Sequence, residues 1–470
     1  MPTKTQNQKT RPLRDATHPE TTFKKDTPRT ETLKANARKT SVRQGIASNL
    51  SVGLGNSQIT PFALALQATP FHIGLLSSFS SLANPVAQLY GSRLMEHKPR
   101  KKILLTFMLF QFLIWLPIIG LGYLFLQGTL TPYLPLALIG LWLLFSAAGG
   151  AMAPAWFSWM GDLVSADHRG RYFSKRNRLI GTFGLIASLT GAILLDFYKT
   201  RGLAIIGFII LFGAAATFKL VAWFFLHHQY APQLKLRKKY YFSFLSFIKR
   251  FDNLGKFATY RAFLNLSIAI AGPFLAVYML QELGFSYTTF MIVSLSGSVF
   301  YLFFSPLAGK FSDRYGNIKL IWIANILWIF TPLLWTFLTK PLHLIMFPAL
   351  ISGIANACWV IAVTNFMYDS SSQEHRGLCV AYSSVLIGVG AFIGALIGGY
   401  LIQYVPAILS NKYTTIFALS AALRLIVGAS FLPKLKEQKH TKRLPPMRIQ
   451  FNHPFKTLNA EIGWFRHVFK

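Results

Sequence analysis

Two nearly identical stretches decide the fold: MGDLVSADHRG at residues 160–170 and MYDSSSQEHRG at residues 367–377. Six of the eleven positions are identical, and LIG recurs at 179–181 and 386–388 with the same offset of 207 residues. A match that keeps register in this way indicates an internal duplication of roughly 210 residues, far longer than the repeat of a solenoid. The chain is therefore expected to consist of two similar halves.

The composition indicates that both halves lie in a membrane. Of the 470 residues, 53% are hydrophobic and 13% are charged, about half the charged share of a soluble domain. Apolar runs of about 20 residues recur along the chain, each long enough to cross roughly 30 Å of hydrocarbon as a helix. A soluble protein with buried helices would need shorter runs and charged helix faces. We therefore expect an all-α polytopic membrane protein.

The apolar runs predict 12 transmembrane helices in two sets of six, with the repeated phrase after the fourth helix of each set. The first set covers 45–67, 72–94, 103–126, 133–158, 178–196 and 203–226. The second set covers 257–280, 286–309, 318–338, 342–366, 380–403 and 413–432. The expected regions are a disordered basic tail (1–44), a six-helix bundle (45–226), a connector (227–256), a second six-helix bundle (257–433) and a basic tail (434–470). Helices lying in the headgroup plane are expected at 240–251 and, with disorder as the alternative, at 458–469.

The basic residues predict the orientation. The tails, the connector, the loops after even-numbered helices and the helix ends beside these loops carry 41 of the 48 Lys and Arg residues, and the opposite loops carry 4. The positive-inside rule therefore places both termini in the cytoplasm. The net charge of +33 follows the cytoplasmic edges of apolar helices, so we expect anionic membrane lipids as partners and no nucleic acid.

The stretch GKFSDRYGNIK, after the eighth expected helix, resembles the signature loop of the major facilitator superfamily, Gly-x-x-x-Asp-Arg-x-Gly-x-x-Lys. The matching positions are Gly309, Asp313, Arg314, Gly316 and Lys319. The resemblance covers the expected helices, about 45–433, and implies two pseudo-symmetric six-helix bundles around a central substrate site. It also implies that the signature acid helps to close the cytoplasmic side by contacting the helix that begins near Arg376. Gly309 and Gly316 are expected to allow a tight reversal between packed helices.

Each half ends its fourth helix with an acid, Asp162 or Asp369. A carboxylate gains nothing from the dipole at a helix C-terminus, so a basic partner is expected. The candidates are Arg169 and Arg376 in the same loops, or the basic ends of neighbouring helices. We expect these groups and Asp313 to form a cytoplasmic latch that holds the halves together when the cavity opens outward.

The first half departs from the signature. Its corresponding loop, GSRLMEHKPRKK at 91–102, has Met95 where the aspartate is expected and Glu96 next to it. The first-half part of the latch is therefore either absent or rebuilt around Glu96.

The resemblance implies a cavity lined by the first, fourth, seventh and tenth helices. Polar and aromatic residues midway along these helices are candidates for substrate contact: Asn56, Gln58, Ser146, Asn265, Asn356 and Trp359. Amides suit a polar solute and an indole offers a stacking face, although polar residues in membrane helices often only join helices to each other. Arg261 is a further candidate, which either snorkels to the surface or holds an anionic substrate.

The positions of the acidic residues and of the glycines bear on the transport mechanism and on helix packing. No Asp or Glu lies midway along an expected helix, which argues against coupling through a buried carboxylate. Glycines 390, 394 and 398 recur at four-residue spacing and predict a close-packing helix face.

We expect a secondary active or facilitative carrier for a small organic solute, working by alternating access. Efflux of amphipathic compounds is the alternative within this class, and a non-transporting scaffold or receptor is the alternative outside it. An enzyme is not expected, because the chain lacks a Ser/His/Asp arrangement, an HExxH motif and a metal-ligand cluster. We expect a monomer in the bacterial cytoplasmic membrane, with no cofactor and no metal.

Overall fold

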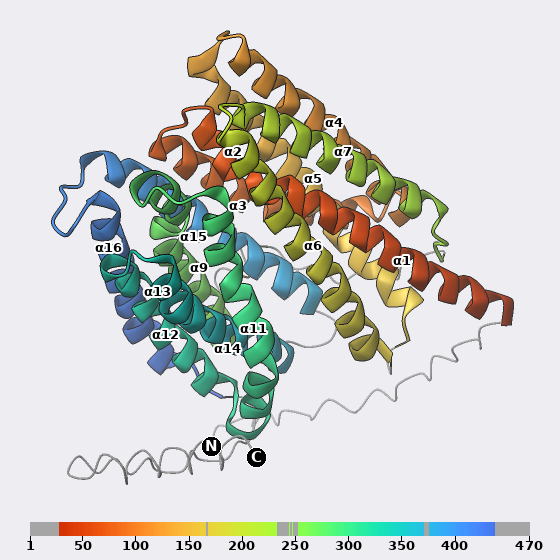
Figure 1. The fold of residues 1–470 in the computed structure, drawn as a ribbon. Coiled ribbons are helices and arrows are strands. Elements are labelled where there is room, and N and C mark those ends of the chain that lie inside the picture. The colour runs from red at the N-terminus through yellow and green to blue at the C-terminus, as the bar shows by residue number, and fades with distance from the viewer. Residues whose placement is uncertain are drawn as a thin grey trace, which may run out of the picture.

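The computed structural model describes residues 28–165, 168–232, 244, 247, 252–370 and 376–437 (Figure 1), and within these ranges all regular secondary structure is helical. The helices of the first half are α1 (Pro28–Leu54), α2 (Ile59–Ala65), α3 (Pro70–Leu94), α4 (Arg100–Leu126), α5 (Leu134–Leu163), α6 (Arg169–Lys199) and α7 (Ala204–His228). The helices of the second half are α9 (Asn253–Ala271), α10 (Phe274–Val277), α11 (Tyr287–Tyr315), α12 (Asn317–Phe337), α13 (Pro341–Leu344), α14 (Leu350–Asp369), α15 (Arg376–Tyr404) and α16 (Lys412–Phe431).

The structure confirms a polytopic helical membrane protein. In the described ranges, 10 helices are long and apolar enough to cross a membrane, and they correspond to the third to twelfth expected spans. The first two expected spans are also helical, as α1 with α2 and as α3, but they are less apolar. The serine-rich α3 packs against both α5 and α15, so that less of its surface has to face lipid. The count of twelve spans stays a prediction.

The expected disordered tail was wrong in its second part, because α1 begins at Pro28 and the segment 28–44 is helical. Its helical structure is supported by contacts with the first bundle. The Arg38 guanidinium donates to the carbonyl of Leu163 (2.9 Å), and the Tyr172 hydroxyl donates to the carbonyl of Arg38 (2.9 Å). Ala37 and Ser41 are buried. Small side chains on this face allow the extension to pack closely, which composition alone did not indicate.

The expected surface helices lie almost entirely outside the described residues. Two side chains of the first one, Phe244 and Phe247, are described. Their rings lie 5.4 and 5.7 Å from the ring of Tyr382 on α15. The helix expected at 458–469 lies wholly outside the described ranges.

The hydrophobic cores show how the two bundles meet. We call the side on which α1 begins and α16 ends the terminal side, and the opposite side the far side. On the far side one buried cluster contains residues of both bundles, including Phe62 and Phe208 of the first and Phe274 and Tyr287 of the second. On the terminal side each bundle has its own buried cluster, and in the described ranges Leu89 of α3 packs against the cluster of the second bundle. The bundles are therefore joined on the far side.

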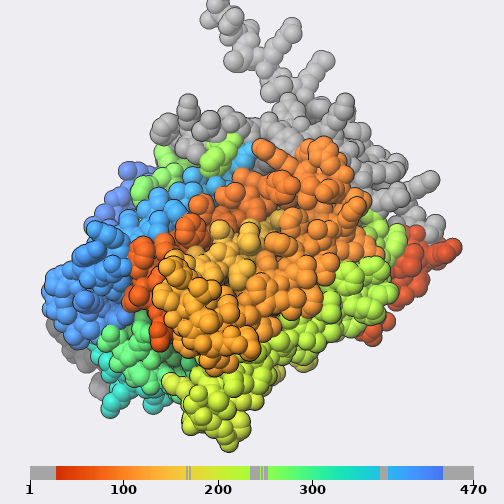
Figure 2. Space-filling model, turned by 90° about the horizontal axis from the view of Figure 1, so that it is seen from above, coloured from red at the N-terminus to blue at the C-terminus, as the bar shows by residue number. Residues whose placement is uncertain are grey.

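Two helix pairs make most of this junction: α3 packs against α15, and α6 packs against α11. The short helix α10 adds contacts with α2 and α3. The atoms of α3 and α15 adjoin over the face seen from above, where orange meets blue (Figure 2). Gly74 and Gly399 bring α3 and α15 together near the far side, since a Cβ added at Gly74 would lie 3.0 Å from the Gly399 Cα and 3.0 Å from the Ala395 carbonyl oxygen.

The predicted close-packing face of α15 is confirmed, and its partner is α9 of the same bundle. A Cβ added at Gly390, Gly394 or Gly398 would collide with a backbone carbonyl of α9. These glycines therefore hold the second bundle together, whereas Gly399 faces the other bundle.

Candidate functional site

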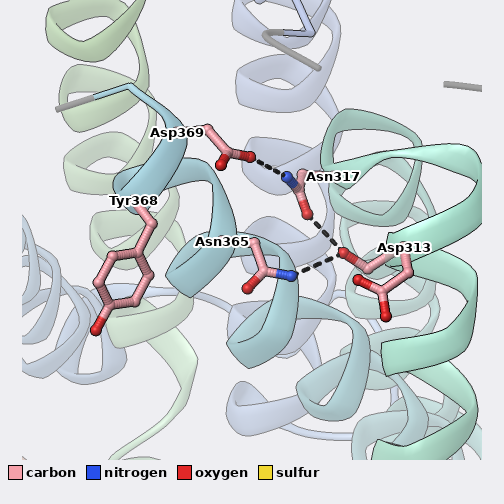
Figure 3. A pocket seen from close by; sticks show the side chains of 6 residues that line it. Asp313, Asn317, Asn365, Tyr368 and Asp369 are labelled. Atoms are coloured by element: carbon pink, nitrogen blue, oxygen red, sulfur yellow. Dashed lines mark hydrogen bonds between the residues drawn. The ribbon is translucent and has the colours of Figure 1, made fainter. Parts of the chain in front are cut away.

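A pocket of about 280 Å³ opens at the terminal side of the second bundle, beside the signature loop (Figure 3). It is lined by Ser312, Asp313, Asn317, Asn365, Tyr368 and Asp369. The loop is very short: α11 ends at Tyr315, Gly316 adopts φ +98°, and α12 begins at the next residue. A positive φ of this kind favours glycine, which confirms the predicted role of Gly316.

The expected role of Gly309 was wrong. This glycine lies inside α11, and no heavy atom lies within 4 Å of the position its Cβ would take. The reversal of the chain therefore depends on Gly316, and Gly309 does not bring two helices together in this conformation.

A chain of hydrogen bonds joins three helices across the pocket (Figure 3). The Asn317 amide donates to Asp369 Oδ2 (3.0 Å) and its Oδ1 accepts from the Ser312 hydroxyl (2.6 Å). The same hydroxyl oxygen accepts from the Asn365 amide (3.0 Å). These bonds tie the end of α14 to the end of α11 and the start of α12. The exposed Asp313 carboxylate makes no hydrogen bond to a described residue in this conformation.

The first bundle has a corresponding tie. Asp162 Oδ2 lies 2.7 Å from the Arg100 guanidinium, which also donates to the Ser158 hydroxyl (3.0 Å) and the Pro232 carbonyl (3.0 Å). Arg100 is the first residue of α4, just as Asn317 is the first residue of α12. In each half, therefore, the acid of the repeated phrase binds the first residue of the helix that contains the third span, α4 or α12.

The structure decides between the expected partners only for Asp162, whose described partner is the basic end of a neighbouring helix. The side chains of Arg169 and Arg376 lie outside the described residues. Both acids bind within their own bundle here, which explains why the phrase occurs in each half.

The other two predicted latch residues also lie on the terminal side. Glu96 follows α3, and Arg314 lies in the last turn of α11.

Replacing Asp162 with Asn should lower the stability of the protein. Arg100 is only 4% exposed, and breaking a buried ion pair leaves an uncompensated charge. The Asp162 side chain is 44% exposed, so solvent screening reduces the expected loss to about 1–2 kcal/mol. The melting temperature in detergent should fall in D162N and stay unchanged in the exposed control Glu31→Gln. Equal melting temperatures of D162N and the native protein would contradict this assignment.

On the far side a carboxylate crosses between the bundles. Asp196, near the end of α6, accepts hydrogen bonds from the backbone amides of Tyr287 and Thr288, each at 2.8 Å. These amides begin α11, where the Ser286 hydroxyl caps the Thr289 amide (3.1 Å). A helix N-terminus attracts a carboxylate through its unpaired amides and its dipole. Asp196 is therefore a polar clamp that closes the far side.

The cavity candidates do not converge on one site. Asn265 and Asn356 donate to carbonyls of their own helices, Arg261 and Ser352 (2.9 and 2.8 Å). Gln58 is fully buried and donates to Ser188 of α6 (3.3 Å). These bonds join or stabilise helices, which is the alternative that the sequence left open.

The remaining candidates have different surroundings. Asn56 has a buried Oδ1 without a hydrogen-bond partner, and the Ser146 carbonyl accepts from the Asn84 amide (3.4 Å). Trp359 packs against Tyr260 and Trp328, with ring centroids 6.0 and 4.9 Å away.

Arg261 donates to the Ser383 hydroxyl of α15 (3.1 Å), and its Nε is buried without a partner. Arg261 and Asn265 lie opposite Phe263 on α9, because two residues correspond to about 200° of an α-helix. Phe263 is 45% exposed and marks the outer face of α9, so Arg261 lies on the opposite face, where it contacts α15 of its own bundle.

Sequence reasoning missed Arg100, Asn317, Asn365 and the clamp made by Asp196. The first two stand at helix starts beside the repeated phrase, so their position was a usable signal. Asp196 and Tyr287 lie 91 residues apart, and the sequence holds no local signal for that contact.

The family model described as Major Facilitator Superfamily matches residues 45–262 and 257–467. Multidrug resistance protein 1 of Bacillus subtilis (strain 168) is 29% identical over 167 residues, 35% of this chain and 42% of that protein. Multidrug resistance protein MdtG of Salmonella dublin is 23% identical over 218 residues, 46% of this chain and 52% of that protein. The matches thus span about half the length of these relatives.

Solved structures show the same fold. A mutant of the nucleoside transporter NupG aligns with a TM-score of 0.67 and 16% identity, over 85% of this chain and 100% of that chain. A bacterial homologue of the iron transporter ferroportin, in an inward-facing state, aligns with a TM-score of 0.61 and 14% identity, over 85% of this chain and 98% of that chain.

Proposed function

Because the chain belongs to the major facilitator superfamily, we propose that it is a carrier that moves a small organic solute across the membrane by alternating access. The observation that carries the proposal is the one-sided junction of the two bundles. Their cores merge on the far side and stay separate on the terminal side. A carrier of this kind works by rocking one bundle against the other around a central site.

We propose that the terminal side is cytoplasmic, so that this conformation faces inward. The distribution of 41 of 48 basic residues supports this orientation. A protease site placed at the C-terminus should be cut in inside-out vesicles and resist cleavage from outside intact cells. Twelve spans, a monomer and contact with anionic lipids belong to the same proposal.

We also propose partners within the cytoplasmic latch, and the helix pairing supports them. Because α3 pairs with α15 and α6 with α11, Glu96 after α3 shares an interface edge with Arg376 at the start of α15. Asp313 near the end of α11 shares the other edge with Arg169 at the start of α6. We assign these two acid–base pairs to the latch of the outward-facing conformation, while Asp162 and Asp369 position its helices from within each bundle.

A single-cysteine reporter distinguishes the two conformations. Val277 of α10 is fully buried where α10 contacts α2 and α3 of the other bundle. Val277→Cys, in a background with Cys358 and Cys379 replaced by Ala, should react with an impermeant maleimide from the far side only when that side opens.

Asp313→Asn should slow this labelling, because it weakens the latch of the outward-facing state without removing a described hydrogen bond from the present one. A latch pair is expected to bias the two states by about 1–3 kcal/mol, roughly five- to hundredfold in population. R169A should have a similar effect, and D313N with R169A should add little to either one. Additive effects would contradict the assigned pair.

The function itself is tested by flux. The purified protein in proteoliposomes should show saturable solute uptake that Gly74→Leu abolishes. A scaffold or receptor would bind partners without flux. Efflux of amphipathic compounds is the second candidate, and the names of the two multidrug resistance relatives favour it.

A further inference from the structure

We propose that the substrate is an amphipathic organic anion, and that Arg261 holds its charged group. The inference rests on the proposed carrier function and names the substrate class of its central site. It is based on the cationic side chains that lie between the membrane-spanning helices, and on the exposure and unused hydrogen-bond donors of Arg261 among them.

Among the described residues, the charged side chains that lie between the membrane-spanning helices are all basic. Four cationic residues from the described spans lie between helices: Arg176, Lys219, Arg261 and Arg424. The acids of the described ranges lie at helix ends, in loops or in the extension of α1: Glu31, Glu96, Asp162, Asp196, Asp252, Glu282, Asp313, Asp369 and Glu437. A carrier interior of this kind attracts anions and repels cations.

Neutral groups compensate these cations only in part. Lys219 donates to the Gln111 side-chain oxygen (3.2 Å), Arg424 to the Trp328 carbonyl (2.7 Å) and Arg176 to the Ser41 carbonyl (3.3 Å). No described carboxylate lies within ion-pair distance of any of the three. An unpaired charge in an apolar interior is costly, and ionisable residues inside the membrane are usually retained for function. A bound anion would lower this cost.

Arg261 has the most exposed side chain of the four. Arg176, Lys219 and Arg424 are 5%, 4% and 6% exposed, whereas Arg261 is partly exposed. Of its five N–H donors, one engages the Ser383 hydroxyl, and the buried Nε has no partner. A planar guanidinium with unused donors suits two-point binding of a carboxylate or sulfonate.

Aromatic residues near Arg261 indicate that the substrate also has an apolar part. The Phe257 ring centroid lies 5.7 Å from its guanidinium carbon, and Trp359 lies 6.5 Å from Phe257. Phe257 is fully buried, whereas Trp359, which packs on it, is partly exposed. Trp359 offers the aromatic face for a solute that has both an anionic group and an aromatic or otherwise apolar body.

Three fluorescent probes with one fluorophore test the proposal: dansylglycine is anionic, dansylcadaverine is cationic and dansylamide is neutral. Uptake is measured in phosphatidylcholine vesicles, whose lipids carry no net charge and do not compete for Arg261. The native protein should take up dansylglycine at least tenfold faster than dansylcadaverine.

Arg261→Gln should slow dansylglycine uptake by roughly ten- to hundredfold, the range for losing a hydrogen bond to a charged group. R261K keeps the charge and should retain a larger part of the rate, while the exposed control Arg201→Gln should match the native protein. Uptake of dansylcadaverine at least as fast as dansylglycine, or equal rates in R261Q and the native protein, would overturn the anion proposal. Absence of flux for all three probes would instead contradict the carrier function.

Discussion

Replacing Gly74 with leucine is expected to abolish transport and to hold the far side of the protein open. A Cβ at this position already lies 3.0 Å from backbone atoms of α15, and α15 is rigidly packed on α9 through its other glycines. The backbones of α3 and α15 therefore have to separate to admit a leucine side chain. The bundles can relieve this clash by rocking toward the outward-facing conformation.

The Val277→Cys reporter measures this effect. Far-side labelling in G74L should approach the rate of an unprotected cysteine, and solute flux should fall to the level of empty vesicles. The matched control is Gly140→Leu, since Gly140 is also inside a helix but has no heavy atom within 4 Å of its Cβ position. G140L should leave both readouts unchanged. Protection of the reporter in G74L would show that the Gly74–Gly399 contact does not close the far side.

Asp196→Asn should also shift the protein toward the outward-facing conformation, with the fold intact. The clamp consists of two hydrogen bonds of 2.8 Å from the first amides of α11 to a carboxylate. An asparagine keeps one acceptor and loses the charge that the helix N-terminus favours. A loss of about 1–3 kcal/mol corresponds to a roughly five- to hundredfold rise in reporter labelling.

A second far-side acid provides the control for this prediction. Glu282 is exposed and makes no hydrogen bond to a described residue, so Glu282→Gln should leave labelling unchanged. Equal labelling of D196N and E282Q would remove Asp196 from the closing contact. A lower melting temperature of D196N without increased labelling would assign it to stability alone.

The sequence by itself determined the membrane class, the duplication and the family, because these depend on composition and on register along one chain. Hydropathy located ten spans that the structure bears out, and the glycine spacing predicted the tight face of α15. The extension of α1 was missed because its helix depends on contacts of Ala37 and Ser41 with the first bundle rather than on local hydropathy.

Only the tertiary structure decided which groups meet. Asp162 and Asp369 were expected to act between the bundles, yet both bind the first residue of a helix in their own bundle. Asp196 had no assigned partner in the sequence, because the amides it binds begin a helix 91 residues away. Arg261 could not be told from a snorkelling residue until the structure showed its hydrogen bond to Ser383 of α15. In each case the contact depends on how helices are placed and rotated against each other, which residue order along a single helix does not specify.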